Sequence, residues 1–297
     1  MMSVIRLRQP VRYAPKSAAC ILVCALLCCM PALAQPVGIV DDPCPNPFVP
    51  SAAFQALVVG LLVEPHTITP EELERFNQSP ELAKVGEAVR RVAGRDWAGL
   101  CRFRAADAKL QAARDRPRVV FMGDSITENW GLADPTFFDG AIVNRGISGQ
   151  TTAQMLVRFR ADVVALRPQT VHILAGTNDV AGNTGPMTAQ DFKNNIMSMV
   201  ELARAGGIDV VIASIPPAAA FGWRPEVKPV ATIKALNQWL HDYSARQGLS
   251  FVDYYPPLVG PNGEFRADLS NDGVHPNRKG YAIMRRLAEA SFAPRSR

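Results

Sequence analysis

The strongest constraint on the fold is an alternation of short apolar runs with longer amphipathic segments beyond Pro117. Such alternation is typical of a parallel sheet with helices on both faces. About 180 residues are enough for one core of this kind. The predicted strands lie near residues 118–122, 141–143, 170–174, 208–213 and 250–253, and the predicted helices near 151–166, 188–205, 230–247 and 276–291.

Polar clusters follow the first three predicted strands, and a fourth lies near the C-terminus. Gly123-Asp124-Ser125 comes after the first strand, Asn144-Arg145-Gly146-Ile147-Ser148-Gly149-Gln150 after the second, and Gly176-Thr177-Asn178-Asp179 after the third. Asp272-Gly273-Val274-His275-Pro276 precedes the last helix. Because the carboxyl ends of parallel strands meet at one edge of a sheet, we expect the four clusters to converge there.

Ser125 is the better of two candidate nucleophiles. It stands at a predicted strand-to-helix corner, where helix N-terminal amides point toward the space that its hydroxyl reaches. The rival is Ser148, since Gly146-Ile147-Ser148-Gly149-Gln150 nearly spells the nucleophile elbow of another hydrolase fold, but its fifth residue is Gln rather than Gly.

His275 is the candidate general base, because an imidazole has a suitable pKa to take a proton from a serine hydroxyl. Asp272 precedes it by three residues, so one tight loop would carry both the base and a carboxylate that orients it. The other histidines, His66, His172 and His241, are interpreted as structural.

With these residues in place, the sequence resembles the SGNH, or GDSL, hydrolase family from about Pro117 to the C-terminus. The resemblance implies a flavodoxin-like three-layer sandwich with a five-stranded parallel sheet. It also implies an acyl-enzyme mechanism in which Ser125 is the nucleophile, His275 the base and Asp272 the residue that orients His275. The matching positions of the four family blocks are Ser125, Gly146, Asn178 and His275, and the implied oxyanion donors are the amides of Ser125 and Gly146 with the side chain of Asn178.

The substrate is less constrained than the chemistry. The resemblance is closest to the lysophospholipase and platelet-activating-factor acetylhydrolase-like branch, which implies short acyl esters; the alternative is an O-acetylesterase acting on polysaccharide or glycan. A carbohydrate-binding protein that retains the fold, and acyl transfer to another alcohol, remain open. Phe221 and Trp223 lie in an irregular loop, residues 216–229, which lines an acyl pocket or packs on the surface.

Two further carboxylates, Asp124 and Asp179, are interpreted as partners of backbone amides in their turns. No two histidines have the spacing of metal ligands, and neither a pair of Cys-x-x-Cys motifs nor a phosphate-binding loop is present. We therefore expect neither a metal nor a cofactor.

Residues 1–34 have the pattern of a secretory signal peptide: basic residues, then an apolar run, then small residues that place cleavage near Ala34. A lipoprotein anchor is the alternative, since Cys24, Cys28 and Cys29 lie in the apolar run, although the bulky Leu27 before Cys28 is unlike the small residue that such processing requires. The four basic residues of this segment would reduce the formal net charge from +5 to +1 on removal. We expect a secreted or periplasmic protein with no stable membrane span and no nucleic-acid partner.

Residues 35–116 are predicted to form a helical N-terminal extension that packs on a hydrolase domain at residues 117–297; a cap that binds substrate or a partner is the alternative. The expected helices of the extension span residues 51–63, 70–93 and 96–113. Cys44 and Cys101, the two cysteines outside the signal segment, are expected to form a disulfide in an exported protein; two unpaired thiols are the alternative.

Overall fold

The computed structural model describes residues 38–44, 47–113 and 116–292; the expected signal peptide lies outside these residues. The chain divides into two units, residues 1–43 and residues 44–297. The described residues of the first unit, 38–43, carry no helix or strand. The second unit contains both the helical extension and the sheet.

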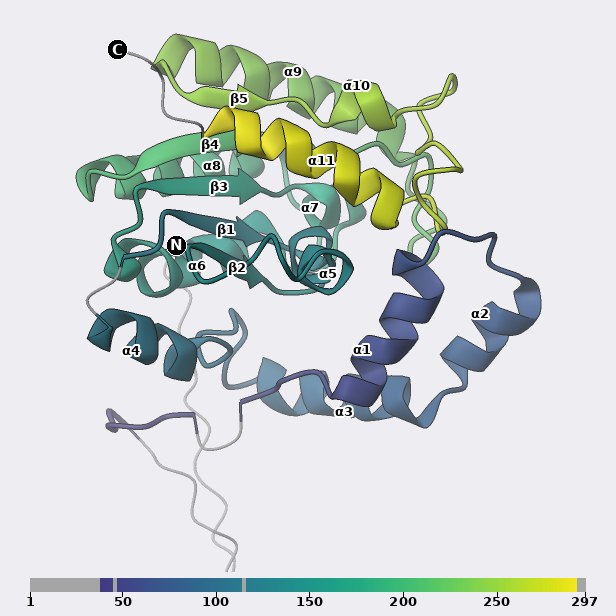
Figure 1. Cartoon of the computed structure of the whole chain (residues 1–297), viewed down its shortest axis with the longest axis horizontal. Helices are drawn as coiled ribbons and strands as arrows, with labels where there is room; N and C mark the ends of the chain where they lie inside the picture. Colours follow the sequence, from purple (N-terminus) through teal and green to yellow (C-terminus); the bar gives the residue numbers. More distant parts are fainter. Residues whose placement is uncertain (1–37, 45–46, 114–115, 293–297) are drawn as a thin grey trace, which may run out of the picture. The chain divides into compact units, whose positions relative to one another are not determined.

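Five parallel strands form the sheet in the order β2-β1-β3-β4-β5 (Figure 1). This order is the flavodoxin-like one, so the expected fold class is confirmed. The strands follow runs rich in β-branched residues, which favour the pleated, buried environment of a parallel sheet. They are β1 (Val119–Gly123), β2 (Ile142–Gly146), β3 (Thr170–Leu174), β4 (Asp209–Ala213) and β5 (Ser250–Val252).

Two helical layers cover the sheet. On one face, side chains of β1 such as Val120 and Met122 pack with α6, α8 and α9; on the other, Val119 and Phe121 pack with α5 and α11. The layers consist of α5 (Ser125–Ala133), α6 (Thr152–Asp162), η2 (Val164–Leu166), α8 (Ala189–Ala205), α9 (Pro229–Gln247) and α11 (Arg278–Ser291), with short α7 (Thr177–Ala181) and α10 (Tyr255–Leu258) in the connections.

The extension comprises α1 (Ala52–Val58), η1 (Val59–Val63), α2 (Pro70–Asn77), α3 (Pro80–Ala93) and α4 (Arg104–Ala112). Two expectations for it are wrong. The helix expected over residues 70–93 is broken, because Ser79 caps a new helix with Pro80 in its first turn. The helix expected from Asp96 begins only at Arg104, because the Asp96 carboxylate accepts hydrogen bonds from two backbone amides and holds a turn.

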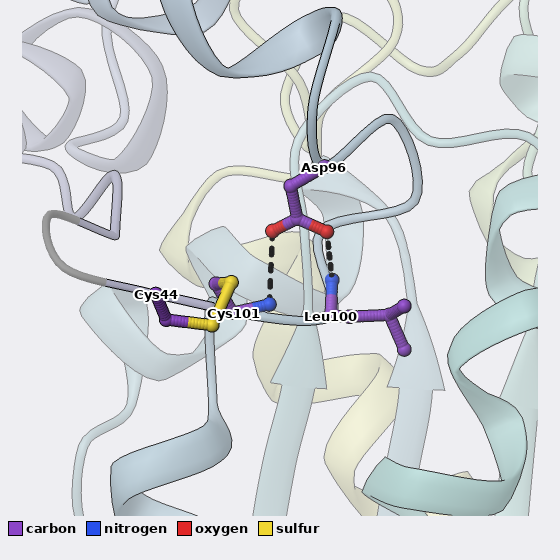
Figure 2. The surroundings of a disulfide bond; sticks show 4 residues. All are labelled: Cys44, Asp96, Leu100 and Cys101. Carbon is purple, nitrogen blue, oxygen red and sulfur yellow. Dashed lines mark hydrogen bonds between the residues drawn. A yellow bond between two sulfur atoms is a disulfide. The ribbon is translucent and has the colours of Figure 1, made fainter. Parts of the chain in front are cut away.

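Cys44 and Cys101 are joined by a disulfide with a Cα–Cα distance of 5.5 Å (Figure 2). The Asp96 turn lies beside it, because its carboxylate accepts from the amides of Leu100 at 2.7 Å and Cys101 at 2.9 Å. The bond therefore fixes Cys44 to the segment between α3 and α4.

No helix of the described ranges is long and apolar enough to cross a membrane.

Candidate active site

Ser125 is the first residue of α5, directly after the end of β1. The corner needs glycine at position 123, since a Cβ there would lie 2.0 Å from Thr127 Oγ1 and 2.9 Å from the Leu174 carbonyl. Asp124 caps the helix by accepting from the Ile126 amide at 2.9 Å. These constraints place the Ser125 hydroxyl beside the positive end of α5.

A loop before α11 brings His275 to Ser125, with 2.9 Å between Ser125 Oγ and His275 Nε2. His275 Nδ1 lies 2.7 Å from Asp272 Oδ2, and Asp272 Oδ1 accepts from the His275 amide at 2.8 Å. Because a carboxylate can only accept, Nδ1 carries the proton and the lone pair of Nε2 faces the serine hydroxyl. Three side chains expected to act together are thus in hydrogen-bond contact.

Charge in the loop tunes both titratable groups. Burial alone would raise the pKa of Asp272, but the His275 charge and hydrogen bonds hold that pKa at about 2, so Asp272 is ionised at neutral pH. Burial alone would lower the pKa of His275, but the Asp272 carboxylate outweighs it and the pKa is raised above its ordinary value. The imidazole is therefore a stronger base than an isolated one.

The amide of Gly146, an expected oxyanion donor, is already engaged: it donates to Asn144 Oδ1 at 2.8 Å. Gly146 serves the packing of α5 on β2, since a Cβ there would lie 2.2 Å from the Glu128 backbone nitrogen. The geometry thus differs from the expectation, because the side chain two residues earlier turns back onto this amide.

The backbone amide of Gly149 is better placed than that of Gly146 to donate to an oxyanion. It lines the same cavity as Ser125, and its backbone has a φ of +79°, which favours glycine. Its carbonyl accepts from Asn183 Nδ2 at 3.2 Å, whereas its amide has no hydrogen-bond partner within the described residues. A free amide at this position was not expected from the sequence.

Asn178 lies in the same cavity and is held firmly. Its side-chain amide donates to Asp124 Oδ2 and to the Gln150 carbonyl, both at 3.1 Å, and its oxygen accepts from Asn183 at 2.7 Å. Burial raises the pKa of Asp124 to about 6, although the Ile126 amide partly opposes this. Through its hydrogen bonds with the Ile126 amide and the Asn178 side chain, Asp124 links the strand-to-helix corner at Ser125 to Asn178.

The remaining expected residues lie as follows. Trp223 lines the cavity and donates to Asn183 Oδ1 at 3.0 Å, whereas Phe221 is fully buried in the core. Ser148 donates to Glu128 Oε2 at 2.6 Å rather than to a histidine. His172 is buried and bonds to a tyrosine hydroxyl.

Asp179 holds the start of α6, because its carboxylate accepts from the Thr152 amide at 3.1 Å. Within the described residues no group of three His, Cys, Asp or Glu side chains is arranged to hold a metal ion, and the expectation of no cofactor stays a prediction.

Two residues that support this site gave no signal in the sequence. Arg158 is fully buried on α6 and donates to the carbonyls of Gly123 at 3.0 Å and Arg145 at 2.9 Å, so it fixes the ends of β1 and β2. Asn183 bridges Asn178, the Gly149 carbonyl and Trp223. Asn183 lies five residues after Asn178, and its backbone amide donates to the backbone carbonyl of Asn178 at 3.0 Å.

The flavodoxin-like sheet carries Ser125, His275 and Asp272 in hydrogen-bond contact at the carboxyl ends of its strands, an arrangement that can activate a serine hydroxyl as a nucleophile. A sequence model of the GDSL-like lipase/acylhydrolase family matches residues 121–283. The chain belongs to this family.

The chain is also similar to individual proteins of known sequence or structure. A candidate acylhydrolase of known structure from Bacteroides fragilis is 44% identical, with a TM-score of 0.64, over 67% of this chain and 97% of that chain. Esterase TesA of Pseudomonas aeruginosa is 31% identical over 53% of this chain and 79% of its own length. An uncharacterized lipoprotein of Bacillus subtilis, YqeF, is 35% identical over 48% of this chain and 70% of its own.

Proposed function

We propose that this protein is an exported serine esterase that cleaves carboxylic esters through an acyl-enzyme on Ser125. The observation that carries the proposal is the contact of Ser125 Oγ with His275 Nε2 at 2.9 Å, backed by Asp272 at 2.7 Å. Membership of the acylhydrolase family and similarity to an esterase support the same reaction class.

The proposed reaction has two halves. Ser125 Oγ attacks the ester carbonyl while His275 Nε2 takes the hydroxyl proton, and His275 then gives this proton to the leaving alcohol. Water enters next, loses a proton to His275 and attacks the acyl-enzyme carbonyl. The bond between Ser125 Oγ and the acyl carbon then breaks, and His275 returns the proton to Oγ, which releases the acid and restores Ser125. Asp272 stays ionised throughout and stabilises the charged imidazole.

We assign the oxyanion to the amides of Ser125 and Gly149, with the side chain of Asn178 beside them. Gly149 replaces Gly146 in this assignment because the Gly146 amide already donates to Asn144. Asn178 would contribute by exchanging its 3.1 Å bond to the Gln150 carbonyl, which is at the long end of the usual range, for the developing charge.

Export is supported by three observations. The pattern of residues 1–34 is that of a secretory signal, Cys44 and Cys101 form a disulfide, and a relative in Bacillus subtilis is described as a lipoprotein. Disulfides persist mainly in oxidising compartments outside the cytosol.

The test is hydrolysis of p-nitrophenyl esters, acetate to dodecanoate, by the chain from Gln35 and by its Ser125→Ala variant. We expect turnover by the unmodified protein and a loss of at least about a thousandfold in the variant. Wild-type turnover by Ser125→Ala would refute the mechanism. Release of acetate from acetylated xylan, with no turnover of any soluble ester, would favour the glycan O-acetylesterase.

A further inference from the structure

The helix α3 (Pro80–Ala93) has a stripe of apolar side chains that the protein buries only in part. Leu82, Val85, Val89 and Val92 recur at helical spacing, yet α3 has no buried residue, and Val89 is 45% exposed. An amphipathic helix normally packs such a stripe against a core. The apolar face of α3 contacts α1 but is only partly covered by it.

Three residues of this face, Val85, Val89 and Val92, line a cavity of about 700 Å³ that reaches Ser125. Its distal wall comes from the extension, including Phe54 and Leu62 beside the α3 stripe. Its proximal end holds Ser125 and His275. One continuous space thus joins an apolar chamber to the proposed point of ester cleavage.

The extension is tied to the catalytic part on two sides of this cavity. Near η1, the Asn271 side chain donates to the carbonyls of Leu61 at 3.0 Å and Glu64 at 2.7 Å. Beyond α3, Arg102 pairs with Glu128 at 2.9 Å, in a contact that is largely buried.

The second side is reinforced by Gln150, which donates to the Ala98 carbonyl at 2.7 Å. Hydrogen bonds on both sides, of which the Gln150 bond is buried, indicate that the chamber is a fixed part of the fold rather than a gap between mobile pieces.

We propose that this cavity binds the acyl chain of the substrate, so that the N-terminal extension makes the enzyme selective for linear aliphatic chains well beyond acetate. The proposal rests on the serine esterase function and replaces the short-acyl expectation. An acyl chain is the occupant that fits, because the group bonded to Ser125 in an acyl-enzyme must extend into the adjoining space. That space is apolar at its distal end and holds more than about twenty times the ~30 Å³ share of one water molecule.

The kinetic test is the same ester series, read as the dependence of kcat/KM on chain length. Each methylene that enters the cavity should raise kcat/KM by roughly two- to fourfold until the chamber is filled. Ser125-dependent turnover that is flat or falls from acetate to octanoate would overturn the proposal and leave the esterase function standing.

Val89→Trp provides a direct test of the wall, because its indole would occupy the chamber from an exposed position on α3 that does not carry the fold. We expect the ratio of octanoate to acetate kcat/KM to fall at least tenfold. Glu87→Trp is the matched control: it is an exposed position of the same helix that does not line the cavity, and its ratio should equal that of the unmodified protein. Equal ratios in both variants would contradict the proposal.

A binding measurement separates this inference from the proposed chemistry. Decanoate added to the Ser125→Ala protein should change the tryptophan fluorescence, because Trp97 and Trp223 both line the cavity, and calorimetry should show saturable binding. Val89→Trp should weaken this binding at least tenfold by calorimetry. Absence of decanoate binding would refute the acyl-chain site, whatever the enzyme hydrolyses. Decanoate binding together with no ester turnover by the unmodified protein would refute only the proposed esterase function.

Discussion

Arg158 donates from its guanidinium to the backbone carbonyl of Gly123 at 3.0 Å, two residues before the proposed nucleophile. The same side chain contacts the Arg145 carbonyl at 2.9 Å and pairs with Asp162 at 2.7 Å, and all of it is buried. One arginine thus joins the ends of two neighbouring strands at the edge where the site lies. The Gly123 carbonyl also accepts from the Ile147 amide at 3.1 Å, so this strand end is held by both a backbone and a side-chain donor.

The first prediction concerns the buried arginine. Arg158→Met should lower the free energy of unfolding by about 3–5 kcal/mol, since Asp162 would remain as a buried charge without its partner. Arg160→Met is the control, because Arg160 lies on the same helix but is exposed; this change should alter the free energy of unfolding by less than ~0.5 kcal/mol. Urea unfolding measures both. Equal stability of the two variants would show that the buried network carries little weight.

The second prediction concerns pH. Asp272 raises the pKa of His275, and only the neutral imidazole can take the serine proton. The pH at which kcat/KM reaches half its maximum on the acid side should therefore lie above about 6.5. Asp272→Asn removes that carboxylate, so burial then dominates and the acid limb should move to lower pH. Activity at the plateau should fall on the order of a hundred- to ten-thousandfold.

The control for that experiment is Asp268→Asn, an exposed carboxylate earlier in the same segment that pairs with Arg266. Its pH profile should match that of the unmodified protein. An acid limb that stays in place in Asp272→Asn would contradict the role assigned to Asp272.

The third prediction separates the two glycines. Gly146→Ala should lower the free energy of unfolding by at least about 3 kcal/mol, because its Cβ would lie 2.2 Å from the Glu128 backbone. Gly149→Ala meets nothing closer than 3.9 Å and should cost only about 1–2 kcal/mol for its positive φ. Thermal unfolding ranks them, and a reversed order would contradict the packing described for β2 and α5.

The fourth prediction concerns the disulfide. Cys44 and Cys101 are 57 residues apart in sequence, and closing a loop of this length stabilises by about 4 kcal/mol in the chain-entropy model. Replacing both cysteines with serine should lower the free energy of unfolding by up to that amount. If urea unfolding of the double variant matched that of the oxidised protein, the bond would not constrain the unfolded chain.

Much of the fold follows from local patterns. The strands end within a few residues of their expected positions because each apolar run is bounded by turn residues. The exception is β2, which extends through Asn144, Arg145 and Gly146, since pairing with β1 continues where the apolar run has ended. The break at Ser79 has a local signal, a capping residue followed by proline, but the helical periodicity on both sides of it obscures that signal.

The site divides in the same way. Ser125, Asp272 and His275 could be predicted because each lies in a short motif at a strand end or before a helix. Arg158 could not, because nothing local distinguishes a buried arginine from an exposed one such as Arg160. The occupied amide of Gly146 depends on the rotamer of a neighbouring side chain. The cavity could not be predicted either, because it depends on how α3 packs in the tertiary structure.

The most direct test of the central claim is to label the proposed nucleophile covalently with a phosphonate, which reacts with an activated serine as an ester would. Incubation with a p-nitrophenyl alkylphosphonate, followed by proteolysis and mass spectrometry, should place one stoichiometric adduct on the peptide at Ser125, with loss of ester hydrolysis in proportion. The Ser125→Ala protein should carry none. An adduct on Ser148, or full hydrolysis in a protein without an adduct on Ser125, would contradict the account.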